Sequence, residues 1–272
     1  MKNILVPTDF SEVSESAADY AAELAKTTGA KLIFYYVFSV PVPVADTPVV
    51  AVPIEELEKE NMKLLHALDK RVKEKHGKVE TELLTQAGFV VDEVISFTKE
   101  HQVDLVVMGV TGAGKTPGIL GSNTTSVMHH AASPVLVVPK GYKFKKPDII
   151  ALACDYKSVL TDNTVKRFKS FVHIFNSKVL VFNVLKPKEL ATYQKAATEV
   201  NLENALSDIE HTLHFPASDN LPQEINEFID KHNAGVLVMF PRHYSFLKGL
   251  VHHSATKEMA YFSHVPLLSI HE

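Results

Sequence analysis

The sequence is short of cysteine and of basic charge. Its 272 residues include one cysteine, Cys154, so no intramolecular disulfide can form, which suits a reducing compartment. Aspartate and glutamate (32) outnumber lysine and arginine (28), and the formal net charge is −4. Because there is no basic surplus to neutralise a phosphate backbone, the composition argues against a nucleic-acid-binding protein.

Long hydrophobic runs are also absent. No apolar stretch approaches the roughly 20 residues of a membrane span. The apolar run near the N-terminus meets Asp9 too soon for a signal peptide. With 46% hydrophobic and 22% charged residues, the chain has the composition of a globular protein. The sequence therefore predicts a soluble, cytoplasmic protein without a membrane partner.

In the first half, short apolar runs alternate with segments of helical periodicity. Ser11 and Gly29 have the residue types of an N-cap and a C-cap around one of these helices. The resulting βαβαβαβαβ order predicts an α/β fold, an open, mainly parallel five-stranded sheet with helices on both faces, of Rossmann-like type. The expected strands are 3–9, 31–38, 79–85, 103–109 and 134–139, and the expected helices are 11–30, 55–77, 90–102 and 122–132.

The second half repeats the order of these segments. The strongest match aligns "GSNTTSVMHHAASPVLVV" (121–138) with "HSATKEMAYFSHVPLLSI" (253–270) without a gap, and three strand-like segments match as well. We therefore expect two tandem domains, 1–139 and 148–272, joined by the basic, proline-ended linker 140–147. Two such copies are expected to form an intramolecular pseudo-dimer, and pairing into a homodimer stays open.

The segment "GVTGAGKT" (109–116) fits the P-loop pattern G-x-x-x-x-G-K-[ST]. A P-loop needs a helix directly after its Lys-Thr pair, because the helix N-terminus and the loop amides hold the phosphates. Here Lys115-Thr116 is followed by "PGILG", in which two glycines disfavour a helix, and the helical pattern restarts only at Ser122. We therefore reject the P-loop interpretation.

The same glycines fit another pattern. Gly109, Gly112 and Gly121-Ser122 lie between the fourth strand and the fourth helix. In this respect the chain resembles the universal stress protein family in its tandem form, whose members have Gly-x2-Gly-x9-Gly-[Ser/Thr] here. In this sequence eight residues, rather than nine, separate the last two glycines. "NILVPTDFSE" (3–12) and "HHAASPVLVVP" (129–139) are similar to the family's first and last motifs, so the resemblance implies that fold twice.

A ligand site is expected beyond the carboxyl ends of the strands, at the topological switch point of the sheet. Glycines there let the backbone approach phosphates, and a helix that opens near Ser122 favours an anion. The resemblance implies ATP, with or without Mg²⁺, with adenine near Val37 and the phosphates on the glycine loop. Neither catalytic residues nor metal ligands are assigned. The expected ligand-binding residues are Pro7, Thr8, Asp9, Val37, Gly109, Gly112, Gly114, Lys115, Gly121, Ser122, Asn123 and Thr124.

An interpretation without a ligand stays open for the same residues. A glycine-rich loop also serves plain turns, and Ser122-Asn123 is a good N-cap by itself. Asp9 could cap the first helix instead of contacting a ribose or an adenine.

The second copy lacks most of the predicted site. Phe240, His243 and His253 stand where the first copy has its three glycines, and only Ser254 and Asp155 correspond to site residues. We therefore expect the second copy to bind ATP weakly or not at all. Histidines 243, 252, 253 and 264 gather around this loop, but adjacent histidines diverge on a helix and no cysteine lies near, so no zinc site is predicted.

Three functions remain on this evidence. The first is an ATP-binding stress-response protein that acts as a regulatory module. The second is a slow ATP hydrolase, which is weakened because Asp9 is the one obvious acid of the predicted site and a hydrolase needs a water-orienting group and a metal-held phosphate. The third is a structural or partner-binding scaffold that holds no nucleotide.

Overall fold

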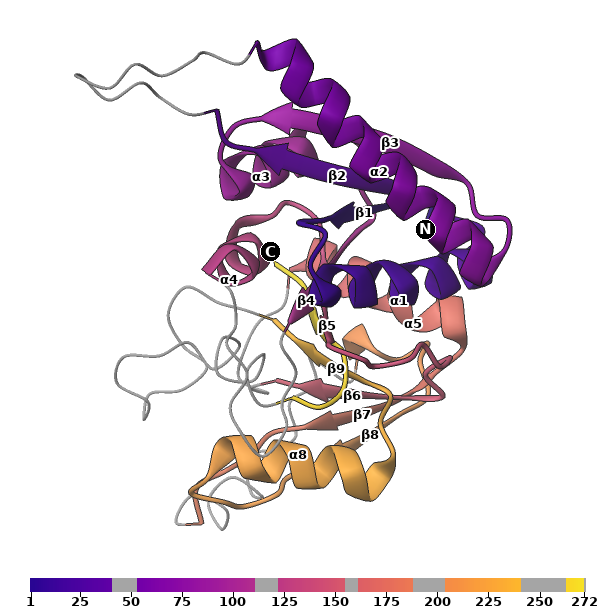
Figure 1. Ribbon diagram of the computed structural model, residues 1–272. Coiled ribbons are helices and arrows are strands. Elements are labelled where there is room, and N and C mark those ends of the chain that lie inside the picture. The colour runs from indigo at the N-terminus through magenta and orange to yellow at the C-terminus, as the bar shows by residue number, and fades with distance from the viewer. Residues whose placement is uncertain (41–52, 111–121, 155–160, 188–203, 241–262, 272) are drawn as a thin grey trace, which may run out of the picture. The chain divides into compact units, whose positions relative to one another are not determined.

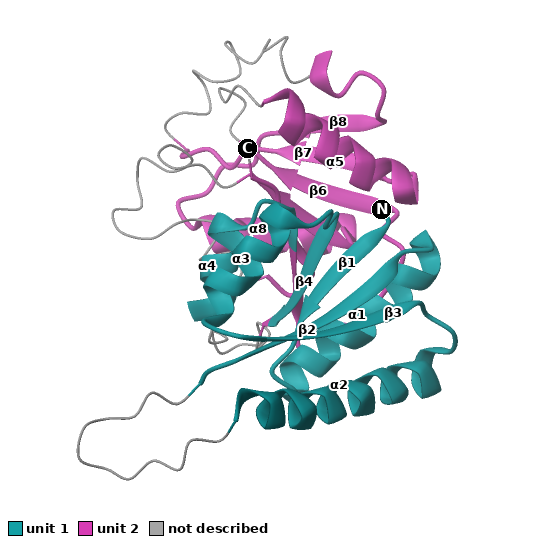
Figure 2. Cartoon of the chain, turned by 90° about the horizontal axis from the view of Figure 1, so that it is seen from above, with its two compact units in different colours: residues 1–109, 121–135 teal, residues 110–120, 136–272 magenta. Residues whose placement is uncertain are grey.

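The computed structural model describes residues 1–40, 53–110, 122–154, 161–187, 204–240 and 263–271 (Figure 1). It divides into two compact units, residues 1–109 with 121–135 and residues 110–120 with 136–272 (Figure 2). The predicted domain limits at residues 139 and 148 stay a prediction. No helix in the described ranges is long and apolar enough to cross a membrane.

The first unit alternates strands and helices along the chain. Its strands are hydrogen-bonded in the order β3-β2-β1-β4. The pairs β2–β3, β1–β2 and β1–β4 are all parallel. These elements are β1 (Asn3–Pro7), α1 (Glu12–Thr28), β2 (Lys31–Phe38), α2 (Ile54–His76), β3 (Thr81–Ala87), α3 (Val90–Glu100), β4 (Leu105–Val110) and α4 (Ser122–His130).

Helices cover both faces of this sheet. The crossovers β1-α1-β2 and β2-α2-β3 run in one direction across the sheet, and the chain then returns to the other side of β1 for β4. Because such crossovers are right-handed, α1 and α2 lie on one face and α3 and α4 on the other, as Figure 2 shows. The reversal places the topological switch point between β1 and β4.

Helix α1 shows why these residues form these elements. The Ser11 side chain accepts the backbone N–H of Ser14 at the N-terminus, and Gly29 ends the helix with a φ of 69°, a left-handed conformation that glycine adopts without strain. Alanines fill most of its buried face, which lets the helix lie close to the sheet. Both caps predicted from the sequence are confirmed.

The second unit contains seven further strands and helices within the described ranges, together with β5 (Val135–Pro139). Its strand order is β5-β10-β9-β6-β7-β8, so the last strands of the two copies are neighbours. The order β8-β7-β6-β9 repeats β3-β2-β1-β4 of the first unit. These elements are β6 (Ile149–Ala153), α5 (Asp162–Phe175), β7 (Lys178–Phe182), β8 (His211–His214), α8 (Leu221–His232), β9 (Val236–Met239) and β10 (Leu267–Ser269).

The predicted α/β class with parallel sheets is confirmed, and the expected strand 31–38 is β2 to the residue. Other elements differ by a few residues at their ends, as is usual for strands and helices called from sequence. Helices α5 and α8 and strand β8 were not predicted individually. The segment 253–270 was matched to a helix followed by a strand. Its residues 253–262, where the helix is expected, lie outside the described residues.

Candidate functional site

The turn from β1 into α1 holds three of the predicted residues, Pro7 to Asp9. Thr8 donates its backbone N–H to the Tyr35 carbonyl oxygen at 3.0 Å, which extends the pairing of β1 with β2. Phe10 has a φ of 59° and donates its N–H to Thr8 Oγ1 at 3.1 Å. This local geometry leaves Asp9 exposed at the carboxyl end of β1, while Pro7 and Thr8 are buried.

The Asp9 carboxylate is prepared to accept hydrogen bonds. Burial by itself would raise the pKa of Asp9, but hydrogen bonds from the Ser11 hydroxyl and backbone N–H outweigh it and lower the pKa below its ordinary value of 3.8. Both groups donate to Oδ1, at 2.6 Å from the hydroxyl and 3.0 Å from the backbone nitrogen. An ionised carboxylate is an acceptor only. Asp9 can therefore receive a hydroxyl or an amino group.

The N-cap of α1 is Ser11 and not Asp9. Ser11 Oγ accepts the Ser14 backbone N–H at 3.3 Å, and the Ser14 hydroxyl contacts Thr8 Oγ1 at 3.2 Å. Asp9 therefore supports the capping residue without occupying the cap. Sequence reasoning missed the part of Ser14 in this turn, although its position three residues after Ser11 was the available signal.

Gly109 lies in β4 where this strand passes the first turn of α1. A Cβ atom at this position would come within 2.4 Å of the Val13 carbonyl oxygen and 2.7 Å of Val13 Cγ1. The close approach of β4 to α1 therefore requires glycine, whether or not a ligand is present. A contact between Gly109 and a phosphate stays a prediction.

Val37 is buried near the end of β2 and pairs with Gln86 of β3. Its side chain shares a sheet face with that of Tyr35, two residues earlier in the strand. The Tyr35 ring contacts Phe97 of α3, with centroids 5.0 Å apart, so Val37 faces the α3 side. Pro7 pairs with Tyr35 and lies on the same side. The structure thus brings Val37 and the end of β1 to one face.

Helix α4 begins at Ser122, the residue at which the sequence predicted it. Ser122 and Asn123 are exposed and Thr124 is buried. The first turn of α4 contains no acidic side chain, so nothing there opposes an anion at the positive end of the helix dipole. The remaining predicted residues, Gly112, Gly114, Lys115 and Gly121, lie outside the described residues.

The second copy has matching hydrogen bonds just before and just after the corresponding connection, whose residues 155–160 lie outside the described ranges. Cys154 donates its N–H to the Phe182 carbonyl oxygen at 3.1 Å, as Thr8 does to Tyr35. Thr161 caps α5 by accepting the backbone N–H of Thr164, as Ser11 does for α1. The end of β6 and the start of α5 therefore keep the hydrogen bonds of β1 and α1.

The position of Gly109 is taken by Phe240 in the second copy. The buried Phe240 ring packs edge-on against Phe168 of α5, with centroids 5.9 Å apart. In the first copy the strand at this position lies directly against α1, whereas in the second copy an aromatic ring packs between the strand and α5. Asp155 and Ser254, the two residues that the copy retains, lie outside the described residues.

Of the four histidines considered as metal ligands, His264 is the one within the described residues. Its Nε2 lies 2.7 Å from Asp230 Oδ1. The described part of the chain contains no group of three or more His, Cys, Asp or Glu side chains that could hold a metal ion. His243, His252 and His253 lie outside it.

Comparison with known proteins identifies the family. The model of the family described as "Universal stress protein family" matches residues 1–139, just over half of the chain. The chain belongs to the universal stress protein family. Its curated relatives include a universal stress protein of Methanocaldococcus jannaschii, 35% identical over 151 residues, which cover 52% of this chain and 84% of the relative. A universal stress protein of Bacillus subtilis is 32% identical over 145 residues, which cover 50% and 97%.

Solved structures extend the likeness to the tandem arrangement. A universal stress protein from Archaeoglobus fulgidus aligns with 99% of this chain and 98% of its own, with a TM-score of 0.73 and 21% sequence identity. A putative universal stress protein from Pseudomonas aeruginosa aligns with 100% and 93%, with a TM-score of 0.64 and 12% identity. At these identities the likeness concerns the fold, and it confirms the two-domain universal stress protein form.

Proposed function

We propose that the first unit of this universal stress protein binds ATP and that the chain acts as a nucleotide-dependent regulatory module. Family membership supports the proposal, because nucleotide binding is typical of the family. The observation that carries it is the ionised Asp9 at the carboxyl end of β1, beside the switch point between β1 and β4. Helix α4, which follows β4 in the chain, begins without an acidic side chain, so its N-terminus can receive a phosphate.

The chemistry of these residues fits a nucleotide. Asp9 would accept hydrogen bonds from a ribose hydroxyl or an adenine amino group. The amides of the first turn of α4, with the exposed Ser122 and Asn123, would donate to phosphate oxygens. Val37 would offer an apolar edge to adenine, and Lys115 would pair with a phosphate. Bound Mg²⁺ would supply charge neutralisation between phosphate groups.

The remaining expectations belong to the same proposal. The second copy would bind ATP weakly or not at all, because Phe240 fills the position of Gly109. It would serve as the partner of the first copy in an intramolecular pseudo-dimer. A cytoplasmic location, which agrees with the single cysteine, is also part of it.

The test is calorimetric titration of ATP with Mg²⁺ into protein shown to be free of carried-over nucleotide. We expect saturation at one site per chain. Asp9→Asn should weaken binding by about tenfold, since a hydrogen bond to a charged group contributes roughly 1.5–3 kcal/mol. Gly112→Val combined with Gly121→Val should abolish it, because two side chains would then occupy the phosphate loop.

Asp219→Asn is the matched control, because it makes the same change of charge at an exposed turn of the second unit. It should leave ATP binding unchanged. Absence of binding by the wild-type chain would defeat the ATP proposal and favour a scaffold. Release of phosphate over many turnovers would favour the hydrolase instead of the regulatory module.

A further inference from the structure

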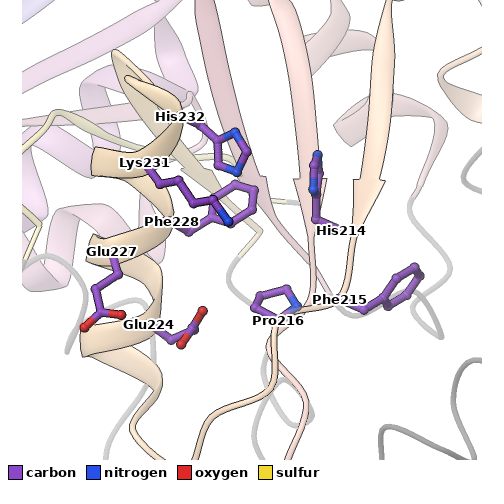
Figure 3. Close-up of a pocket in the computed structure, with 8 residues that line it drawn as sticks. All are labelled: His214, Phe215, Pro216, Glu224, Glu227, Phe228, Lys231 and His232. Atoms are coloured by element: carbon purple, nitrogen blue, oxygen red, sulfur yellow. The ribbon is translucent and has the colours of Figure 1, made fainter.

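Two histidines of the second unit lie next to each other where helix α8 meets strand β8 (Figure 3). The ring centroids of His214 on β8 and His232 on α8 are 5.2 Å apart. The His214 ring lies 5.2 Å and the His232 ring 4.4 Å from the ring of Phe228 on α8. Because Phe228 is buried and stacks on Phe182 of β7, the two imidazoles are held at the contact between the helix and the sheet.

Lysine side chains add positive charge around these histidines. Lys231, the residue before His232, lines a pocket of about 350 Å³ between β8 and α8 together with both histidines (Figure 3). On the strand side, Lys178 at the start of β7 pairs with Glu210 at 3.0 Å. A proton on His214 therefore adds a charge of the same sign to a group of neighbouring cations.

The surroundings of His214 oppose its protonation. Burial lowers the pKa of His214 below its ordinary value of 6.5, and the positive charges of His232, Lys231 and Lys178 lower it further. The hydroxyl oxygen of Thr212, 2.9 Å from Nε2, carries no charge that could compensate. The unfolded chain therefore takes up this proton more readily than the folded chain. The free energy of unfolding consequently decreases as the pH falls from about 6.5 through the folded-state value.

The acidic side chains of α8 do not offset these charges. Glu224 lies in the first turn of α8, at the end opposite the histidine. Glu227 accepts a hydrogen bond from the Gln223 amide at 2.8 Å, and Asp230 Oδ1 lies 2.7 Å from Nε2 of His264. Two of the three carboxylates thus have partners of their own, and the third is two turns away along the helix.

The first copy provides an internal comparison. The register of β3 with β2 and of β8 with β7 places Leu84 at the strand position of His214. The helix position is kept, because His101 stacks on Phe97 at 4.0 Å, much as the histidine of α8 lies on Phe228.

The charged groups differ between the copies. The residue before the helix histidine is Glu100 in the first copy and Lys231 in the second. A protonated imidazole at the helix position therefore has an acid beside it in the first copy, and a lysine and a second imidazole beside it in the second. The cluster of groups that repel one another when protonated is particular to the second copy.

We propose that the contact between β8 and α8 is a pH-sensitive switch in the second unit. Protonation of His214 places a positive charge beside His232 and Lys231, and the repulsion loosens α8 from the sheet. The fraction of molecules in which α8 has opened locally therefore increases as the pH falls, and opening exposes Phe228. The proposal is independent of ATP binding in the first unit, because none of these residues belongs to that site.

The test is hydrogen exchange of the backbone amides of the full chain at about pH 7.5 and at about pH 5.5, corrected for the intrinsic effect of pH on exchange. We expect the protection factors of α8 to fall by about threefold or more between these values. Helix α3, which holds the same place in the first copy, should change less. This comparison uses the wild-type chain and does not depend on any variant folding.

Two variants install residues of the first copy. His214→Leu removes the group that takes up the proton and should abolish the loss of protection. Lys231→Glu places an acid beside the imidazoles at an exposed position and should make the loss smaller. The matched control is His66→Leu, which removes an exposed histidine from α2 and should leave the pH response of α8 unchanged.

Three results would each overturn the proposal. The first is a protection of α8 that does not change between the two pH values, and the second is an equal loss in α3. The third is a full loss of α8 protection in His214→Leu or Lys231→Glu, provided that circular dichroism shows the variant to be folded.

Discussion

Gly109 and Phe240 occupy the same place in the two copies with opposite consequences for packing. At Gly109 the missing side chain lets β4 pass the first turn of α1. At Phe240 the strand instead carries a ring, which packs on Phe168 of α5. A single residue thus decides how closely the strand and the helix approach each other, and the sheet tolerates either solution.

Gly109→Ala should lower the free energy of unfolding by about 2 kcal/mol or more, because the new Cβ would meet the Val13 carbonyl oxygen, a backbone atom that cannot turn away. Chemical denaturation measures the loss. Gly88→Ala is the control in the same unit. The three atoms nearest its Cβ would all belong to the Glu93 side chain, which can turn away, and we expect a loss below about 1 kcal/mol. Equal losses would contradict this account of Gly109.

At the scale of elements, α1 and α2 are joined by a network of charged side chains. Asp19 lies 3.0 Å from Arg71 Nη1, 2.7 Å from Lys75 Nζ and 3.0 Å from His76 Nε2. His76 Nδ1 also lies 2.7 Å from Glu23. Because His76 and Asp19 are largely buried, screening by solvent is weaker here than at the exposed ion pairs of α2.

Asp19→Asn should destabilise the first unit by about 1 kcal/mol near neutral pH. Burial would raise the pKa of Asp19, but hydrogen bonds from Lys75 and His76 and the charge of Arg71 lower it below 3.8. A lowered folded-state pKa means that the contribution is complete above about pH 4 and is lost as the pH falls through the folded-state value. Chemical denaturation of the wild-type chain and of Asp19→Asn, from neutral pH down to strong acid, measures the difference in their free energies of unfolding.

The control for the network is Glu60→Gln, which removes an exposed pair with Lys63 on α2. It should change stability little at any pH. If Asp19→Asn kept its full effect in strong acid, the charge of Asp19 would not be the cause.

Sequence patterns predicted the first copy better than the second, for physical reasons. Strands β1, β2 and β4 are continuous apolar runs, and the caps of α1 are residues with strong positional preferences. Strand β8 has four residues and reads "HTLH", which has too little apolar periodicity to indicate a strand. It forms because β7 offers it a parallel partner.

The arrangement of the candidate site residues could be predicted in outline but not in detail. The switch point follows from the element order, so the meeting of Asp9, Val37 and Gly109 at one end of the sheet could be inferred. The left-handed Phe10 could not, since phenylalanine seldom adopts that conformation. The pocket between β8 and α8 could not either, because its residues gather only through the pairing of β8 with β7.

At the scale of the whole molecule, the two copies share one strand order but differ in the side chains that follow their strands, such as Gly109 and Phe240. Saturating ATP should stabilise the state that binds it by about 2.7 kcal/mol at a hundredfold excess over Kd. Bound ATP should slow the exchange of backbone amide hydrogens in β1, β4 and α4 but not in β6 or β9. Comparable slowing in both units would contradict a nucleotide site confined to the first copy.

Cys154 gives the chain a practical property. Its thiol is the single one in the sequence and is buried at the end of β6, with 4% of the residue exposed. A thiol-reactive dye should therefore leave the native chain largely unlabelled. Ser122→Cys would add one accessible attachment point at the start of α4, with the wild-type cysteine left in place. Single cysteines added at the surface can therefore be labelled selectively without first removing Cys154, so that one dye reports on one helix.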